Sequence, residues 1–252
     1  MLRSTFQHIP GVGERREREL WSLGCRTWDD FLSGDYDSGR QSRLRAGVLE
    51  SKSRLDVLDH NYFKNSLPSA ISWRAYRDFQ DHACYVDIET TGLAPGHSHV
   101  TTVCLHSCRE TKSYIRHQNL DELGEDLRKY KYIVSFNGAR FDLPFLSADL
   151  GIVFDHIHLD LLYPLKRLGY RGGLKAIEGR LGMSRDTEGV TGFDAVRLWR
   201  SYRSGRTVNV AGMDVSGESA LDLLVRYNKE DTVNLEFLAD FTVNELRKVS
   251  GF

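Results

Sequence analysis

The sequence predicts an α/β domain preceded by a small helical module. Two observations favour this fold class. After about residue 82 the chain contains short apolar strand-like runs, the first three closely spaced and the later ones alternating with helical segments. From Gly173 onward helical segments dominate. A strand meander, then strand–helix alternation, then helices is the pattern of a sheet covered by helices.

The N-terminal module begins with a tight turn in residues 9–13 (IPGVG), followed by a predicted helix over 14–23. A second helix is expected in 25–32, with Thr27 as its N-cap and Asp30 three residues later. This arrangement resembles a helix-hairpin-helix module, whose glycine turn offers backbone N–H groups to a phosphate. The alternative is a docking cap whose glycines only make the turn.

A charged connector with one or two helices follows in residues 34–70, and Pro68 marks the predicted boundary. We therefore expect a helical module in residues 1–68 and an α/β domain in residues 69–252. Strands are predicted at 84–88, 99–106, 113–116, 132–136 and 156–161. Helices are predicted at 120–130, 143–150 and about 219–248, with a loop or hairpin at 205–217.

The composition argues against several classes of protein: polybasic binders, disulfide-rich scaffolds and membrane proteins. The 252 residues include 34 basic and 35 acidic side chains, a net charge of −1, which argues against a polybasic binder but leaves room for a local basic patch. Four cysteines are too few for a disulfide scaffold. The sequence shows neither an apolar run long enough for a membrane span nor a secretory signal, so we expect a cytoplasmic protein without a membrane partner.

Two acidic residues lie in the first predicted strand. Asp87 and Glu89 are two residues apart, so both side chains point to the same face of the sheet. That face could be the solvated side of an edge strand. However, Tyr85, Val86 and Ile88 indicate a core strand, where two bare carboxylates are costly. A divalent cation such as Mg²⁺ would offset that cost.

Two further acids occupy positions where sites are commonly built. Asp142 lies where a strand gives way to a helix, at the carboxyl end of the strand. Asp231 shares a helix face with Tyr227, four residues before it. Each has an ordinary alternative, Asp142 as an N-cap and Asp231 as a solvated helix residue. The functional interpretation depends on all four acids together.

The sequences around these acids resemble those of a known family. Residues 87–93 (DIETTGL), 137–146 (NGARFDLPFL) and 227–231 (YNKED) are similar to the three motifs of the DEDD 3′–5′ exonucleases, in the subclass with tyrosine in the third motif, DEDDy. The five-residue step from Asn137 to Asp142 in the second motif is closer to that of the proofreading domains of family B DNA polymerases than to the shorter step of bacterial proofreading subunits. With residues 173–178 (GLKAIE), the wider pattern resembles the YprB-like exonucleases over about residues 82–245.

This resemblance implies a ribonuclease H-like fold, a mixed sheet flanked by helices. It implies a two-metal mechanism in which two Mg²⁺ or Mn²⁺ ions are held by Asp87, Glu89, Asp142 and Asp231. Tyr227 would orient the attacking water, since an ordinary phenol pKa of about 10 disfavours general-base work. The resemblance also implies that the 3′ terminal nucleotide contacts Thr90, Thr91, Leu93, Asn137 and Phe141. For Asn137, a simple turn role before Gly138 is an equal alternative.

Positive charge gathers in residues 164–210, which hold ten Lys or Arg against four acids. Arg197, Arg200 and Arg203 recur every third residue, with Trp199 and Tyr202 between them. Arginines interleaved with aromatics suit a strand of phosphates and unstacked bases. The alternative is a solvated helix face with its aromatics turned to the core.

The sequence therefore predicts a metal-dependent 3′–5′ exonuclease acting on single-stranded DNA or RNA, or on unpaired 3′ ends. The alternatives are a catalytically silent nucleic-acid-binding module on the same fold and a structure-specific endonuclease. All four acids and the tyrosine being present disfavours the silent module.

Overall fold

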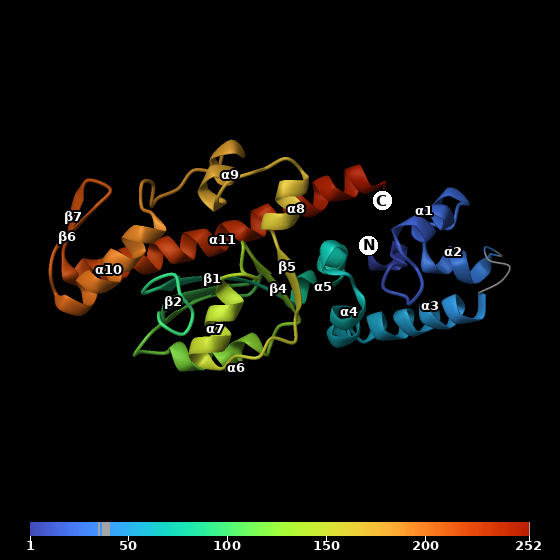
Figure 1. Ribbon diagram of the computed structural model, residues 1–252, viewed down its shortest axis with the longest axis horizontal. Helices are drawn as coiled ribbons and strands as arrows, with labels where there is room; N and C mark the ends of the chain where they lie inside the picture. The colour runs from blue at the N-terminus through green and yellow to red at the C-terminus, as the bar shows by residue number, and fades with distance from the viewer. Residues whose placement is uncertain (35, 37–40, 252) are drawn as a thin grey trace.

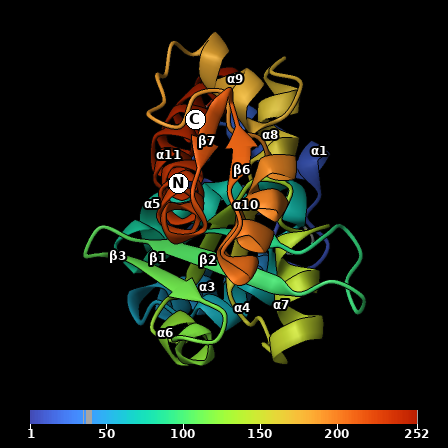
Figure 2. The same ribbon diagram turned by 90° about the vertical axis from the view of Figure 1, so that its left-hand side faces the viewer.

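The computed structural model describes residues 1–34, 36 and 41–251; residues 35 and 37–40 of the predicted connector lie outside this part. A mixed five-stranded sheet forms its centre, in the order β3-β2-β1-β4-β5 (Figures 1 and 2). The strands are β1 (Ala83–Thr90), β2 (Val100–His106), β3 (Thr111–Ile115), β4 (Tyr132–Ser135) and β5 (Ile157–Asp160). β1, β2 and β3 pair antiparallel, whereas β1, β4 and β5 are parallel. The predicted α/β class and mixed sheet are confirmed.

The alternation of side chains along β1 determines what each face of the sheet contacts. Val86 and Ile88 pack into the core beneath α6 (Leu123–Leu127) and α7 (Asp142–Leu150). Tyr85 points to the opposite face, in the core that α11 (Gly217–Ser250) covers. Because the side-chain period of a strand is two, Asp87 and Glu89 continue the row of Tyr85 on the α11 face.

α11 is the longest helix among the described residues, with 34 residues running across the sheet (Figure 1). The Ser216 hydroxyl accepts the Ser219 N–H at 3.2 Å and caps its start. Gly251, with a φ of 75°, ends it in the left-handed region. The helix predicted over 219–248 is therefore confirmed.

The predicted N-terminal module contains the helices α1 (Glu14–Ser22), α2 (Trp28–Ser33), α3 (Gln41–Asp56) and α4 (His60–Ser66), and α5 (Tyr76–Phe79) follows it before the sheet begins. The predicted cap of α2 is present, because Thr27 Oγ1 accepts the Asp30 N–H at 3.1 Å and the Asp30 carboxylate accepts the Thr27 N–H at 2.7 Å. Gly11 has a φ of 87° in the predicted turn, and Gly13 caps α1. Phosphate binding by this turn stays a prediction.

The module and the sheet share one apolar core. Phe6, Trp28 and Phe63 belong to the same buried cluster as Tyr85 and Leu235. The predicted boundary near Pro68 therefore divides the sequence at a place where packing is continuous. The division into two domains stays a prediction.

The remaining elements follow β5 on the α11 side. They are α8 (Leu162–Arg167), α9 (Leu174–Arg180), α10 (Gly192–Ser204) and the hairpin β6 (Val208–Val210) and β7 (Met213–Val215). The hairpin fills the predicted loop or hairpin at 205–217. The helix predicted over 120–130 is shorter, a 3₁₀ turn over Leu120–Glu122 and then α6 to Leu127, because the chain must turn back to enter β4. Among the described residues, no helix is long and apolar enough to span a membrane.

Candidate active site

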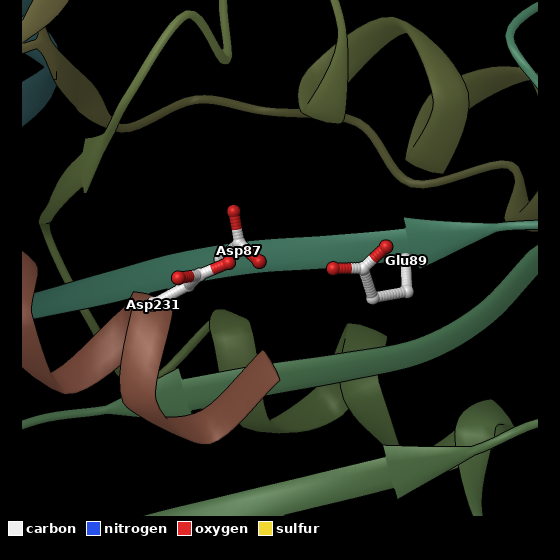
Figure 3. A group of neighbouring side chains, drawn as sticks. All are labelled: Asp87, Glu89 and Asp231. Atoms are coloured by element: carbon white, nitrogen blue, oxygen red, sulfur yellow. The ribbon is translucent and has the colours of Figure 1, made fainter. Parts of the chain in front are cut away.

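Three of the four predicted acids meet between β1 and α11. Asp87 and Glu89 point from β1 towards the helix, and Asp231 points back from α11 (Figure 3). One carboxylate oxygen from each residue lies within 4.8 Å of the others. Residues 144 positions apart in the sequence converge because α11 crosses the face of β1 on which the odd-numbered side chains lie.

The fourth acid, Asp142, is the first residue of α7. It is buried, with 3% of its surface exposed. Together with the other three acids it lines a cavity of about 490 Å³, whose wall also includes Asn137, Phe141 and Tyr227. The structure thus brings together all the predicted acids, the tyrosine and two of the predicted substrate contacts.

The loop that delivers Asp142 is held by Asp160 at the end of β5. The Asp160 carboxylate accepts the Asn137 N–H at 2.7 Å and the Ala139 N–H at 3.1 Å. A Cβ on Gly138 would lie 2.1 Å from Ser135 Oγ, so only glycine fits there. Asn137 itself has a φ of 60°, which makes it a turn residue as well as part of the cavity wall. The two roles considered for Asn137 are compatible.

The acids carry more negative charge than their surroundings favour. Burial raises the pKa of Asp87 well above its usual range, and the charges of Asp231, Asp142 and Glu89 raise it further. Burial and the charge of Asp231 do the same to the pKa of Glu89. Burial raises the pKa of Asp142 to about 7. Carboxylate oxygens are the ligands that hard divalent cations prefer. A bound cation would offset the repulsion among these carboxylates and stabilise their ionised forms.

Polar side chains that the sequence analysis missed hold this cluster. Asn228 Nδ2 donates to Asp87 Oδ2 at 2.8 Å and to the Asp87 carbonyl at 3.1 Å. Its position three residues before Asp231, on the same helix face, was the available signal. Lys175 lies over the Tyr227 ring, with Nζ 4.2 Å from the centroid, and it donates to the Val190 carbonyl. Lys175 was visible in the 173–178 pattern, but without an assigned role.

Tyr227 is nearly enclosed, with 4% of its surface exposed. Burial raises its pKa far above the usual value for a phenol, and the charges of Asp231, Glu89 and Asp87 raise it further. The phenol therefore keeps its proton at physiological pH. A phenol that keeps its proton can donate a hydrogen bond but does not act as a general base.

The remaining predicted substrate contacts lie outside the cavity wall. Thr90 Oγ1 donates to the Gly92 carbonyl at 2.5 Å, and Thr91 Oγ1 accepts the His99 N–H at 2.9 Å. Both hydroxyls therefore serve the turn after β1. Leu93, in that turn, is 85% exposed and available to a ligand.

The predicted arginine stripe lies on α10. Arg200 and Arg203 are exposed, whereas Arg197 NH1 pairs with Asp194 Oδ1 at 3.0 Å. Trp199 is buried, with 6% exposed, in a cluster with residues of α11. For this aromatic the alternative interpretation was correct, because α10 needs an apolar face to pack on α11.

A family model and several solved structures are similar to this chain. A family model described as the RNase H superfamily matches residues 84–243. The fold is similar to that of a family B DNA polymerase from Pyrobaculum calidifontis, at 16% identity and a TM-score of 0.46, over 64% of this chain but only 25% of the polymerase. It is also similar to Brucella melitensis NrnC bound to pGG, at 20% identity and a TM-score of 0.44, over 70% of this chain and 78% of NrnC.

No curated protein sequence matches the chain significantly. The family model, however, spans well over half of the 252 residues. The matched part includes strand β1 and helices α7 and α11, which carry the four acids. The chain belongs to the RNase H superfamily.

Proposed function

We propose that this chain is a metal-dependent 3′–5′ exonuclease of the DEDDy type. One observation carries the proposal: Asp87, Glu89 and Asp231 converge within 4.8 Å, in a cavity that Asp142 and Tyr227 complete. Membership of the RNase H superfamily supports hydrolysis of phosphodiester bonds as the reaction class. Strained acidic clusters of this kind are typical of functional sites.

Asp87, Glu89, Asp142 and Asp231 would hold the cations, which we propose to be two Mg²⁺ or Mn²⁺ ions. Bound divalent ions lower the pKa of water and stabilise charge on a reacting phosphate. The protein contributes preorganisation: Asn228 fixes Asp87, and Asp160 fixes the loop before Asp142. These contacts are made by folding, before any ligand binds.

The substrate contacts follow from the walls of the cavity. Phe141 is partly exposed there and offers a ring surface to a terminal base, while Leu93 offers an exposed apolar side chain nearby in sequence to Glu89. A cavity of about 490 Å³ suits an unpaired nucleotide rather than a duplex. Single-stranded DNA or RNA, or a frayed 3′ end, is therefore the proposed substrate.

We propose that residues 69–252 form the exonuclease domain and residues 1–68 an accessory helical module. The turn containing Gly11 and Gly13 precedes α1, so its backbone N–H groups suit a phosphate of a longer substrate. In this view the module serves binding, and the chemistry belongs to the sheet domain.

A digestion panel tests the proposed function. Single-stranded DNA or RNA labelled at the 5′ end should be shortened stepwise from the 3′ end with Mg²⁺ or Mn²⁺, faster than the matching blunt duplexes, and EDTA should stop the reaction. Release of mononucleotides supports the proposal. Cleavage of a circular substrate would instead show an endonuclease, and binding without turnover would show a silent module.

Replacing Tyr227 by phenylalanine should lower kcat about 10- to 100-fold, because the hydroxyl that orients water is lost while the ring packing stays. Mn²⁺ affinity, measured by titration calorimetry, should change little. The pH–rate profile should keep its shape, since a phenol that stays protonated does not titrate in the working range. Loss of one limb of the profile would contradict the orienting role.

The double substitution Arg200→Gln/Arg203→Gln should weaken binding of a single-stranded oligonucleotide, because both exposed guanidinium groups are proposed to contact phosphates. Two lost contacts should lower the slope of log K against log salt by about 1.4. Fluorescence anisotropy in EDTA measures both effects. The matched control is Arg109→Gln/Arg128→Gln, two exposed arginines outside α10, which should leave binding unchanged.

A further inference from the structure

A buried arginine joins the acidic cluster from the segment between α9 and α10. The Arg185 side chain is only 8% exposed, and it hydrogen-bonds to Asp231 Oδ1 on α11 and to Glu178 Oε2 on α9. Its Nε also lies 3.6 Å from Glu230 Oε2. One guanidinium group thus contacts three carboxylates from two helices.

The contacts around Arg185 fix it at both ends. At the guanidinium end, Glu178 is fully buried, and its second oxygen accepts Asn234 Nδ2 at 2.8 Å. At the backbone end, the Glu230 carboxylate accepts the N–H groups of Asp186 at 2.6 Å and Thr187 at 3.1 Å. The segment that carries Arg185 is therefore fastened to α11 beside Asp231.

We propose that Arg185 is the positioning residue for Asp231. By occupying Oδ1, the rigid guanidinium fixes the rotation of the carboxylate, which faces Asp87 and Glu89 as Figure 3 shows. The cation site then exists before a cation arrives, with Arg185 held in turn by Glu178. The inference rests on the proposed function, since it takes these three acids as cation ligands.

The direction in which cation affinity changes when Arg185 is removed distinguishes a positioning role from a purely electrostatic one. Arg185 is a positive charge beside a proposed cation site, so on charge alone its removal should strengthen cation binding. Loss of a group that orients a ligating carboxylate typically weakens metal affinity about 10- to 100-fold. The two effects have opposite signs, and the proposal requires the second to dominate.

The experiment is a calorimetric titration of the full chain with Mn²⁺ in the absence of nucleic acid. Arg185→Gln should weaken Mn²⁺ binding about 10- to 100-fold. The control Arg180→Gln removes an exposed arginine of α9 and should leave the affinity unchanged. Glu178→Gln should also weaken binding, and combining it with Arg185→Gln should add little, because both act through the same guanidinium.

Arg185→Lys keeps the charge but loses the planar fork, so it should bind Mn²⁺ more weakly than the wild type, whereas a pure charge effect predicts no change. If Arg185→Gln does not fold, Arg185→Lys and Glu178→Gln test the proposal in its place. Unchanged or tighter Mn²⁺ binding in the folded variants would overturn the positioning role. Absence of Mn²⁺ binding by the wild type would overturn the proposed function itself.

Discussion

Asp87→Asn should abolish nuclease activity and at the same time stabilise the metal-free protein. The Asp87 side chain lies among Glu89, Asp142 and Asp231, and burial together with these charges raises its pKa well above the usual range. A neutral amide of the same shape relieves that repulsion and can keep the hydrogen-bonding partner Asn228 by turning its oxygen towards it. The same change removes a proposed cation ligand, so turnover should fall by at least about a thousandfold, roughly 4 kcal/mol of transition-state stabilisation.

Two measurements on one sample check this expectation. Thermal unfolding in EDTA should show a higher Tm for Asp87→Asn than for the wild type, and added Mn²⁺ should raise the Tm of the variant less. Digestion of a labelled oligonucleotide should show no product. Asp81→Asn, at an exposed position just before β1, is the matched control and should change neither quantity. An active Asp87→Asn enzyme would refute the proposed site.

Asp142→Asn should become progressively more stable than the wild type as the pH rises from about 4 to about 7. In the folded protein burial raises the pKa of Asp142 to about 7, whereas in the unfolded chain an aspartate titrates near about 4. Between these values the folded state binds the extra proton, so the free energy of unfolding of the wild type falls as the pH rises. Asparagine does not titrate, and at about 1.4 kcal/mol per pKa unit the gap should reach a few kcal/mol.

Denaturant unfolding in EDTA at pH values from 4 to 8 measures this gap. It should be smallest near pH 4, widen up to about pH 7 and then level off. Mn²⁺ should stabilise the wild type more at high pH than at low pH, because cation binding requires ionised carboxylates. A gap that stays constant across the range would show that Asp142 does not titrate with a raised pKa.

Much of the fold was predictable because its signals are local. The alternation in β1 placed Val86 and Ile88 on one face and the acids on the other, and the structure has this arrangement. The cap at Thr27 was predictable from Thr27 and Asp30, which are three positions apart, and the structure contains it. The end of α6 was missed because it depends on where β4 begins, which is a tertiary constraint that helical periodicity does not contain.

The acids of the site were predictable for a similar reason, since each lies within a short motif. Among the residues that hold them, Asn228 lies within the third motif, whereas Arg185 had no local signal. Arg185 is 46 positions from Asp231, and its segment reaches α11 only through the packing of α9 and the contacts of Glu230. The hydroxyl of Thr90 donates within the turn after β1, and contact of this turn with a substrate stays a prediction.

Because α11 packs in two separate apolar clusters, it affects how the molecule unfolds on heating. Its first half, with Leu224 and Tyr227, belongs to the cluster around α10, and its second half, with Leu238 and Leu246, belongs to the core shared with the N-terminal module. At about 1.5 Å per residue, 34 residues make a rod of about 50 Å with Asp231 near its middle. Because both clusters pack on the same helix, we expect the two ends of the molecule to unfold together with the acidic cluster in one thermal transition.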